Sequence, residues 1–67
     1  MPNTELLKEK IKDSGMTVVS IAKKSGMLRE TLYNRLNGEG EWKVSEVRGL
    51  TDTLRLSNQD RDEIFLS

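Results

Sequence analysis

The sequence predicts an all-α fold, a compact five-helix domain, and three observations support this expectation. Apolar residues recur three or four positions apart, as in the pairs Leu7 and Ile11 or Leu32 and Leu36, and this spacing places them on one face of a helix. Glycines and helix-capping residues separate these apolar stretches. Alternation of polar and apolar residues, which marks a strand, is nowhere sustained.

The first two helices have clear boundary signals. We expect one helix over Thr4–Ser14, because Gly15 follows at the position of a left-handed C-terminal cap. Thr17 is suited to cap the N-terminus of a second helix over Val18–Ser25, which Gly26 then ends. Two short helices therefore occupy the first 26 positions.

A third helix is predicted over Leu28–Asn37, with Gly38 as its stop signal. Residues 38–41 are polar and lack periodicity, so we expect a loop there. A fourth helix follows from about Trp42, and its apolar positions are Val44, Val47, Leu50 and Leu54.

Within the fourth helix, Gly49 should cost about 1 kcal/mol relative to alanine. It marks either close approach of another helix, within the domain or across a dimer, or simple tolerance. Ser57 and Asp60 resemble a capping box and begin a last helix that carries Ile64. The expected interior of the domain consists of Leu7, Ile11, Ile21, Ala22, Leu32, Leu36, Trp42, Val47, Leu50, Leu54 and Ile64.

Length and composition restrict the classes of function. With 67 residues, the chain is a single domain, 1–67. It has no cysteine and no histidine, so disulfides and the usual zinc-ligand sets are excluded. General acid–base catalysis at neutral pH most often uses histidine, and we therefore expect no enzymatic activity, no cofactor and no metal.

No stretch approaches the roughly 20 apolar residues of a membrane span, so a soluble protein that is not exported is expected.

The charges are balanced in number but not in position. Eleven basic and eleven acidic side chains give a net charge of zero, which argues against binding nucleic acid by charge alone. Residues 1–36 carry seven basic and four acidic side chains, and the remainder carries four and seven. Such polarity suits a molecule with one face toward phosphates, although a solvated charge split without function is an equal alternative.

The segment 17–38 holds the most informative spacing. Ala22 precedes Gly26 by four residues; a small side chain lets two helices cross closely, and glycine permits the tight turn between them. The segment Glu30–Gly38, the aromatic Trp42, the Ser45-Glu46 pair and the end Asp62–Phe65 complete a pattern that covers nearly the whole chain. This pattern resembles the lambda-repressor and Cro-like helix-turn-helix family, and more closely its small members from temperate phages of Gram-positive bacteria.

The resemblance implies which side chains read DNA bases, because the second helix of the family's motif faces the major groove. The positions that match are Leu28, Arg29, Glu30, Tyr33, Asn34 and Asn37. The chemistry agrees, since Arg can bond guanine and Asn adenine bidentately, Glu can accept from cytosine, and Leu can touch a thymine methyl. The alternatives are a merely solvated helix face and, for Tyr33, a ring that covers part of the core.

Contacts with DNA phosphates are expected around this helix. The candidate residues are Thr17, Lys23, Lys24, Arg35, Asn37 and Lys43. The sequence departs from the family at Leu28, where Ser or Thr often caps the helix, and at Arg35, which is apolar in many members. Its neutral net charge is a third departure.

The resemblance implies a transcriptional regulator of the Cro or repressor type in the bacterial cytoplasm, associated with the nucleoid when bound. Its partners would be a double-stranded operator and a second copy, with half-sites about 34–36 Å apart or a multiple of this. The candidate dimer contacts are Ile64, Phe65 and Leu66; equally, Phe65 can fold back onto Trp42. A second hypothesis is a protein-interaction module that modulates a repressor, which the acidic residues Asp60, Asp62 and Glu63 favour.

Overall fold

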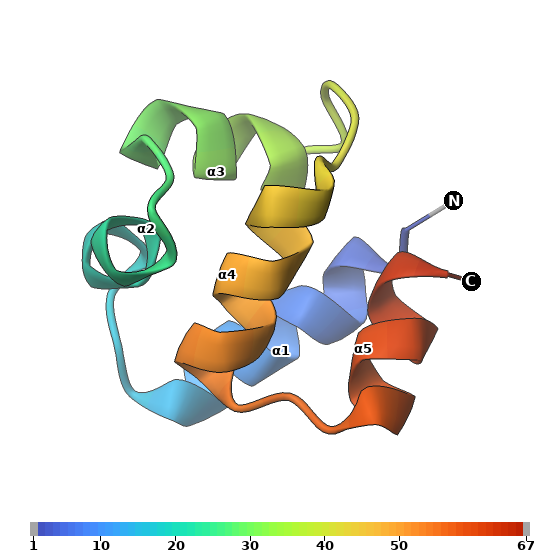
Figure 1. The fold of residues 1–67 in the computed structure, drawn as a ribbon. Helices are drawn as coiled ribbons and strands as arrows, with labels where there is room; N and C mark the ends of the chain where they lie inside the picture. The colour runs from blue at the N-terminus through green and yellow to red at the C-terminus, as the bar shows by residue number, and fades with distance from the viewer. Residues whose placement is uncertain (1, 67) are drawn as a thin grey trace.

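Five α-helices and their connections make up the structure, a computed structural model that describes residues 2–66 (Figure 1). The helices are α1 (Thr4–Ser14), α2 (Val18–Ser25), α3 (Arg29–Leu36), α4 (Val44–Leu54) and α5 (Asn58–Phe65). No strand occurs in this part of the chain. The all-helical prediction and its five elements are thus confirmed.

Helix α4 lies in the middle of the molecule (Figure 1). It packs most extensively against α2, and α2 in turn packs against α3. On the other side of α4, α1 contacts α5, and the amide of Asn3 donates to the carbonyl of Ile64 at 2.6 Å. The two ends of the described chain therefore lie side by side, and α3 runs along the top of the view in Figure 1.

Local capping explains the helix boundaries. The side chains of Asn3, Thr17 and Ser57 each accept a hydrogen bond from a backbone amide of the following helix. The donors are the amides of Leu6, Ser20 and Asp60, respectively. Helix α3 is one residue shorter at each end than predicted, because Leu28 and Asn37 are its flanking residues. Helix α4 begins at Val44 rather than near Trp42.

The interior is formed by eight apolar side chains, all of them predicted. They are Leu7, Ile11, Ile21, Ala22, Leu32, Leu36, Leu50 and Ile64. Three further predictions are wrong in degree, since Trp42, Val47 and Leu54 are only half-buried. Trp42 and Leu54 pack against the edge of this core. One buried residue was not predicted at all: Glu46.

Gly49 marks a close approach between α4 and the end of α2, which is one of the alternatives that the sequence left open. A Cβ atom at this position would press against the carbonyl oxygen of Ser25 and lie 3.2 Å from its Cα. The Ser25 hydroxyl donates to Thr53 Oγ1 at 3.1 Å beside this contact. A side chain at position 49 would push α2, and the turn that follows it, away from α4.

The end of the chain belongs to the core of the monomer. Ile64 is fully buried, so its assignment to a dimer contact is wrong. Phe65 packs edge-to-face on Trp42, with ring centroids 5.1 Å apart, which confirms the alternative for this residue. Of the three candidate dimer contacts, Leu66 is the exposed one, with 76% of its surface accessible. Within residues 2–66, no helix is both long and apolar enough to cross a membrane.

Candidate nucleic-acid interface

Helices α2 and α3 form a corner held by local contacts. Three residues, Gly26, Met27 and Leu28, connect the helices. The amide of Met27 donates to the carbonyl of Ala22 at 2.9 Å, and Gly26 adopts a left-handed conformation with φ of 75°. Since L side chains rarely adopt this conformation, glycine allows the chain to leave α2 and begin α3 within one tight turn.

The outer face of α3 carries the predicted base-reading side chains. Arg29, Glu30, Tyr33 and Asn34 are all exposed, as is Asn37 just beyond the last turn. Their spacing of one, four, five and eight residues places them on one helix face. The opposite face is anchored by Leu32 and Leu36, which are buried. Helix α3 therefore lies on the core by its leucines and turns its polar side chains outward.

The side chains of this outer face are available for intermolecular contacts. Among the side-chain hydrogen bonds and ion pairs within residues 2–66, Arg35 is the contributor from α3, and Arg29, Glu30, Tyr33 and Asn34 make none. Tyr33 is 46% exposed, so its ring does not serve mainly to cover the core. The outer face thus combines a guanidinium, a carboxylate, a phenol and an amide that are not engaged by the protein.

Leu28 lies at the N-terminal end of the same face. It precedes α3 in an extended conformation, and no side-chain hydrogen bond caps the helix at this residue. Its side chain is 74% exposed. A leucine so exposed gains little from burial within the monomer, and it lies where the first turn of α3 presents amides without intrahelical partners.

Arg35 does not belong to the outer face, so the structure corrects its assignment as a phosphate contact. Its Nε lies 3.3 Å from Glu46 Oε1, and its Nη1 donates to the carbonyl of Glu39 at 3.2 Å. The side chains of Arg35 and Glu46 are only 15% and 10% exposed. The guanidinium is therefore used inside the protein, where it joins α3 to α4.

The remaining predicted phosphate contacts lie at the ends of the helices. Thr17 uses its Oγ1 to accept from the amide of Ser20 at 3.1 Å, so it acts as a cap of α2. Lys23 and Lys43 are exposed. Lys24 is exposed as well, and its Nζ lies 3.6 Å from Met16 Sδ, toward α1. Val19, half-exposed on α2, is an apolar surface residue that the sequence reasoning did not single out.

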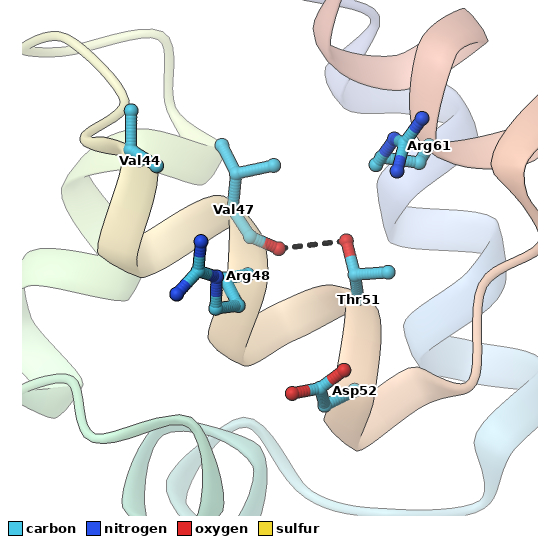
Figure 2. A pocket seen from close by; sticks show the side chains of 6 residues that line it. All are labelled: Val44, Val47, Arg48, Thr51, Asp52 and Arg61. Carbon is cyan, nitrogen blue, oxygen red and sulfur yellow. Dashed lines mark hydrogen bonds between the residues drawn. The ribbon is translucent and has the colours of Figure 1, made fainter.

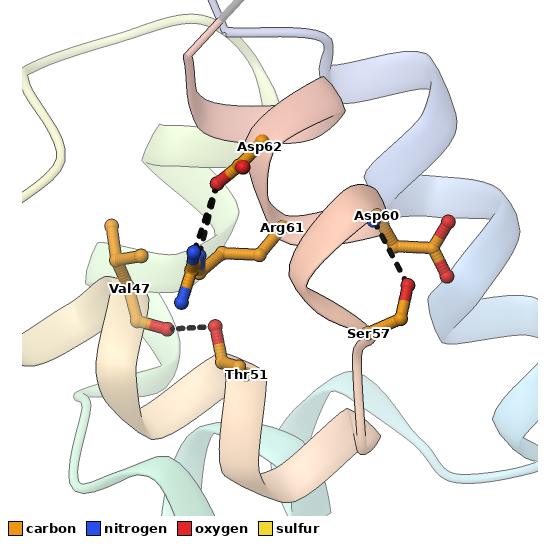
Figure 3. A network of polar contacts seen from close by, with 6 residues as sticks. All are labelled: Val47, Thr51, Ser57, Asp60, Arg61 and Asp62. Carbon is orange, nitrogen blue, oxygen red and sulfur yellow. Dashed lines mark hydrogen bonds and ion pairs between the residues drawn. The ribbon is translucent and has the colours of Figure 1, made fainter.

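The acidic side chains of α5 are engaged within the protein. Asp60 lies 3.1 Å from Lys10 Nζ, Asp62 lies 3.0 Å from a guanidinium nitrogen of Arg61, and Glu63 accepts from Gln59 at 3.3 Å. Figure 3 shows Arg61 extending from α5 toward α4 while it holds Asp62. Because these carboxylates are engaged within the chain, the acidic residues of α5 are a weaker indication of a protein-binding surface.

In residues 2–66, no cluster of three or more acidic, histidine or cysteine side chains is placed to hold a metal ion. Comparison with known proteins adds no further assignment, because no protein-family model, curated protein or solved structure matches the chain. The function is therefore inferred from the outer face of α3 and from the arrangement of α2 and α3 alone.

Proposed function

We propose that this protein is a sequence-specific DNA-binding regulator of transcription, of the phage Cro or repressor type. In this proposal, α2 and α3 are the two helices of a helix-turn-helix, and α3 enters the major groove. One observation carries the proposal: α3 buries Leu32 and Leu36 while its outer face keeps polar side chains that the protein does not engage. A major groove about 12 Å wide admits a helix of this kind.

The outer face has the chemistry that base reading requires. Arg29 offers the planar pair of donors that matches the O6 and N7 acceptors of guanine. Asn34 offers the donor and acceptor that match adenine, and Glu30 accepts from the amino group of cytosine. Leu28 and the Tyr33 ring supply apolar surface for thymine methyl groups. Together these residues can discriminate base pairs along one side of the groove.

Contacts with phosphates would fix the orientation of α3. We assign this role to the N-terminal turn of α2, where Thr17 caps the helix, to Lys23 in the last turn of α2, and to Asn37 and Lys43 at the two ends of the loop between α3 and α4. A helix N-terminus combines amide donors with a positive dipole end and so favours a phosphate. Lys24 remains in the set as a weaker candidate, because its ammonium leans toward Met16.

A monomer of this size offers one recognition helix and few phosphate contacts. Useful affinity therefore calls for two copies on a palindromic operator. We propose a homodimer that acts in the bacterial cytoplasm on double-stranded DNA, without enzymatic activity or a cofactor.

The proposal is tested by selecting binding sites from a random duplex pool at moderate salt. The full chain is compared with the double variant Arg29→Ala/Asn34→Ala and with the control Lys12→Ala/Asn58→Ala, whose positions are exposed on α1 and α5. We expect the protein and the control variant to enrich one motif, and the α3 variant to lose it. Enrichment of the same motif by all three would refute base reading by α3, and no enrichment by the intact chain would refute sequence-specific binding.

The alternative, a module that binds a repressor protein, rests on the acidic residues of α5. Because Asp60 and Asp62 are held by Lys10 and Arg61, the structure offers this alternative less support than the exposed face of α3 offers DNA binding. Salt separates the two, since a protein that neutralises several phosphates loses DNA affinity steeply as salt rises. Binding through an apolar patch does not show this loss.

A further inference from the structure

One face of α4 is left uncovered by the other helices. Leu50 on the inner face is fully buried, whereas Val44 at the start of the helix is 77% exposed. Arg48 and Asp52 follow Val44 at intervals of four residues and are exposed too. Figure 2 shows these three side chains along the outside of α4. An apolar residue and two opposite charges thus form a ridge on this face.

The order of the charges on this ridge is self-complementary. Arg48 precedes Asp52 by one helical turn, and within residues 2–66 neither is paired with an opposite charge. When two copies of α4 pack antiparallel across a two-fold axis, Arg48 faces the partner's Asp52 and Asp52 faces the partner's Arg48. An isologous interface requires this match of a surface with itself.

The ridge forms one wall of a groove between α4 and α5. Val47, Thr51 and Arg61 complete the lining of this groove, and its volume is about 320 Å³. The Thr51 hydroxyl donates to the carbonyl of Val47 at 2.7 Å, and Arg61 is fixed by Asp62. The groove walls are therefore held in place, as Figures 2 and 3 show. A ridge next to a groove is the surface on which helices pack.

We propose that this face of α4 binds a second copy of the chain, in a two-fold arrangement with antiparallel α4 helices. Val44 of each copy then lies over the opposite end of the partner helix, and two reciprocal Arg48–Asp52 pairs flank the axis. This surface would provide the contact for the proposed homodimer, which Ile64 and Phe65 cannot provide because they pack within the monomer. Only the role of the dimer on DNA rests on the proposed function.

The size of this surface limits the affinity that we expect between the two copies. Helix α4 has 11 residues, or about 16 Å of length, so one helix pair falls below the roughly 1,200–2,000 Å² of a standard interface. We expect a weak dimer, observed at high protein concentration and supported by adjacent half-sites on DNA. The charge pairs select the partner and its orientation more than they add affinity.

The test uses sedimentation equilibrium of the full chain without DNA, at roughly 0.1–1 mM, a range suited to a weak interface. Arg48→Asp places aspartates opposite each other, and Asp52→Arg places arginines opposite each other, so each variant alone should lose self-association at least about tenfold. An equimolar mixture should form a heterodimer, because one contact is then the original Arg48–Asp52 pair and the other is the same pair with its charges reversed. Reversals at exposed Glu9 and Lys12 of α1 serve as matched controls and should self-associate like the parent chain.

A parent chain that stays monomeric over this range, or single variants that self-associate like it, would overturn the proposal. Failure of the mixture to form a heterodimer would do so too, provided that circular dichroism shows folded variants. If a charge variant does not fold, Val44→Ser decides, since this exposed substitution should weaken self-association and unchanged self-association would refute the surface. Because DNA is absent, failure here is distinct from failure of base reading: a monomer that still enriches a single half-site would keep the proposed function.

Discussion

The guanidinium of Arg35 and the carboxylate of Glu46 form an ion pair that joins the last turn of α3 to the first turn of α4, with Nε and Oε1 3.3 Å apart. The same carboxylate oxygen accepts from the amide of Lys43 at 3.0 Å. Arg35 also donates to the carbonyl of Glu39. One largely buried network therefore fixes the end of α3, the loop that follows it and the start of α4.

Replacing Glu46 by glutamine should lower the free energy of unfolding by about 1–3 kcal/mol, because a mostly buried guanidinium loses its counter-charge. The amide oxygen of glutamine can still accept from Lys43, so the change isolates the ion pair. Urea unfolding measures the effect. Glu5→Gln removes the exposed pair with Lys8 and should change stability by less than about 1 kcal/mol. Equal effects of the two substitutions would contradict a structural role for Glu46.

Replacing Phe65 by leucine should lower the free energy of unfolding by about 1–2 kcal/mol, because it removes the edge-to-face contact with Trp42 and some buried area. Thermal unfolding of the monomer at low concentration measures this loss. Leu66→Ala is the neighbouring control and should have little effect on stability, since Leu66 is exposed. A loss of self-association by Phe65→Leu with unchanged monomer stability would instead favour a dimer contact.

Local signals explain how much of the fold was predictable. Thr17 and Gly26 bound α2 through hydrogen bonds and backbone conformation within a few residues, so sequence alone placed that helix correctly. The spacing on α3 likewise separated Leu32 from the outer face. The ion pair of Arg35 was not predicted, because its partner lies 11 residues away and its orientation depends on how α4 packs. The sequence did contain an indication of this ion pair, because Glu46 is a carboxylate within the apolar pattern of α4.

The end of the chain shows the same limit of sequence reasoning. Apolar residues such as Ile64 and Phe65 suit a core and an interface equally well, because the hydrophobic effect is not directional. Only the three-dimensional arrangement shows that Trp42 is available to Phe65. The outer face of α3 was easier to predict, since helical periodicity alone separates it from the buried leucines.

Replacing Gly49 by alanine should destabilise the protein by about 1–2 kcal/mol, although alanine favours a helix by about 1 kcal/mol. The added Cβ would press on the backbone of Ser25, and such overpacking costs about 1–3 kcal/mol. Ser45→Ala, an exposed change in the same helix, should alter stability by less than about 0.5 kcal/mol. Stabilisation by Gly49→Ala in urea unfolding would mean that α2 and α4 do not approach closely.

Replacing Arg55 by glycine should stabilise the protein by about 0.5–1 kcal/mol. Arg55 ends α4 in a left-handed conformation, with φ of 52° and ψ of 47°. This conformation costs an L residue about 1–2 kcal/mol, of which the greater freedom of glycine in the unfolded chain offsets a part. Lys12→Gly, inside α1, should have the opposite sign, with a loss of about 1 kcal/mol. Destabilisation by Arg55→Gly would show that the arginine side chain itself holds the turn.

Substitutions on α3 and α2 should affect DNA binding in different ways. Asn34→Ala should reduce discrimination at one base position by about 1–3 kcal/mol, since it removes a bidentate contact with a base edge. Lys23→Ala should weaken all sequences alike and reduce the slope of log affinity against log salt by about one, because one fewer phosphate is neutralised. Titration of the selected site and of single-base variants at several salt concentrations measures both effects. Equal losses on every sequence for Asn34→Ala would remove this residue from the base-reading set, and an unchanged salt slope for Lys23→Ala would remove the lysine from the phosphate set.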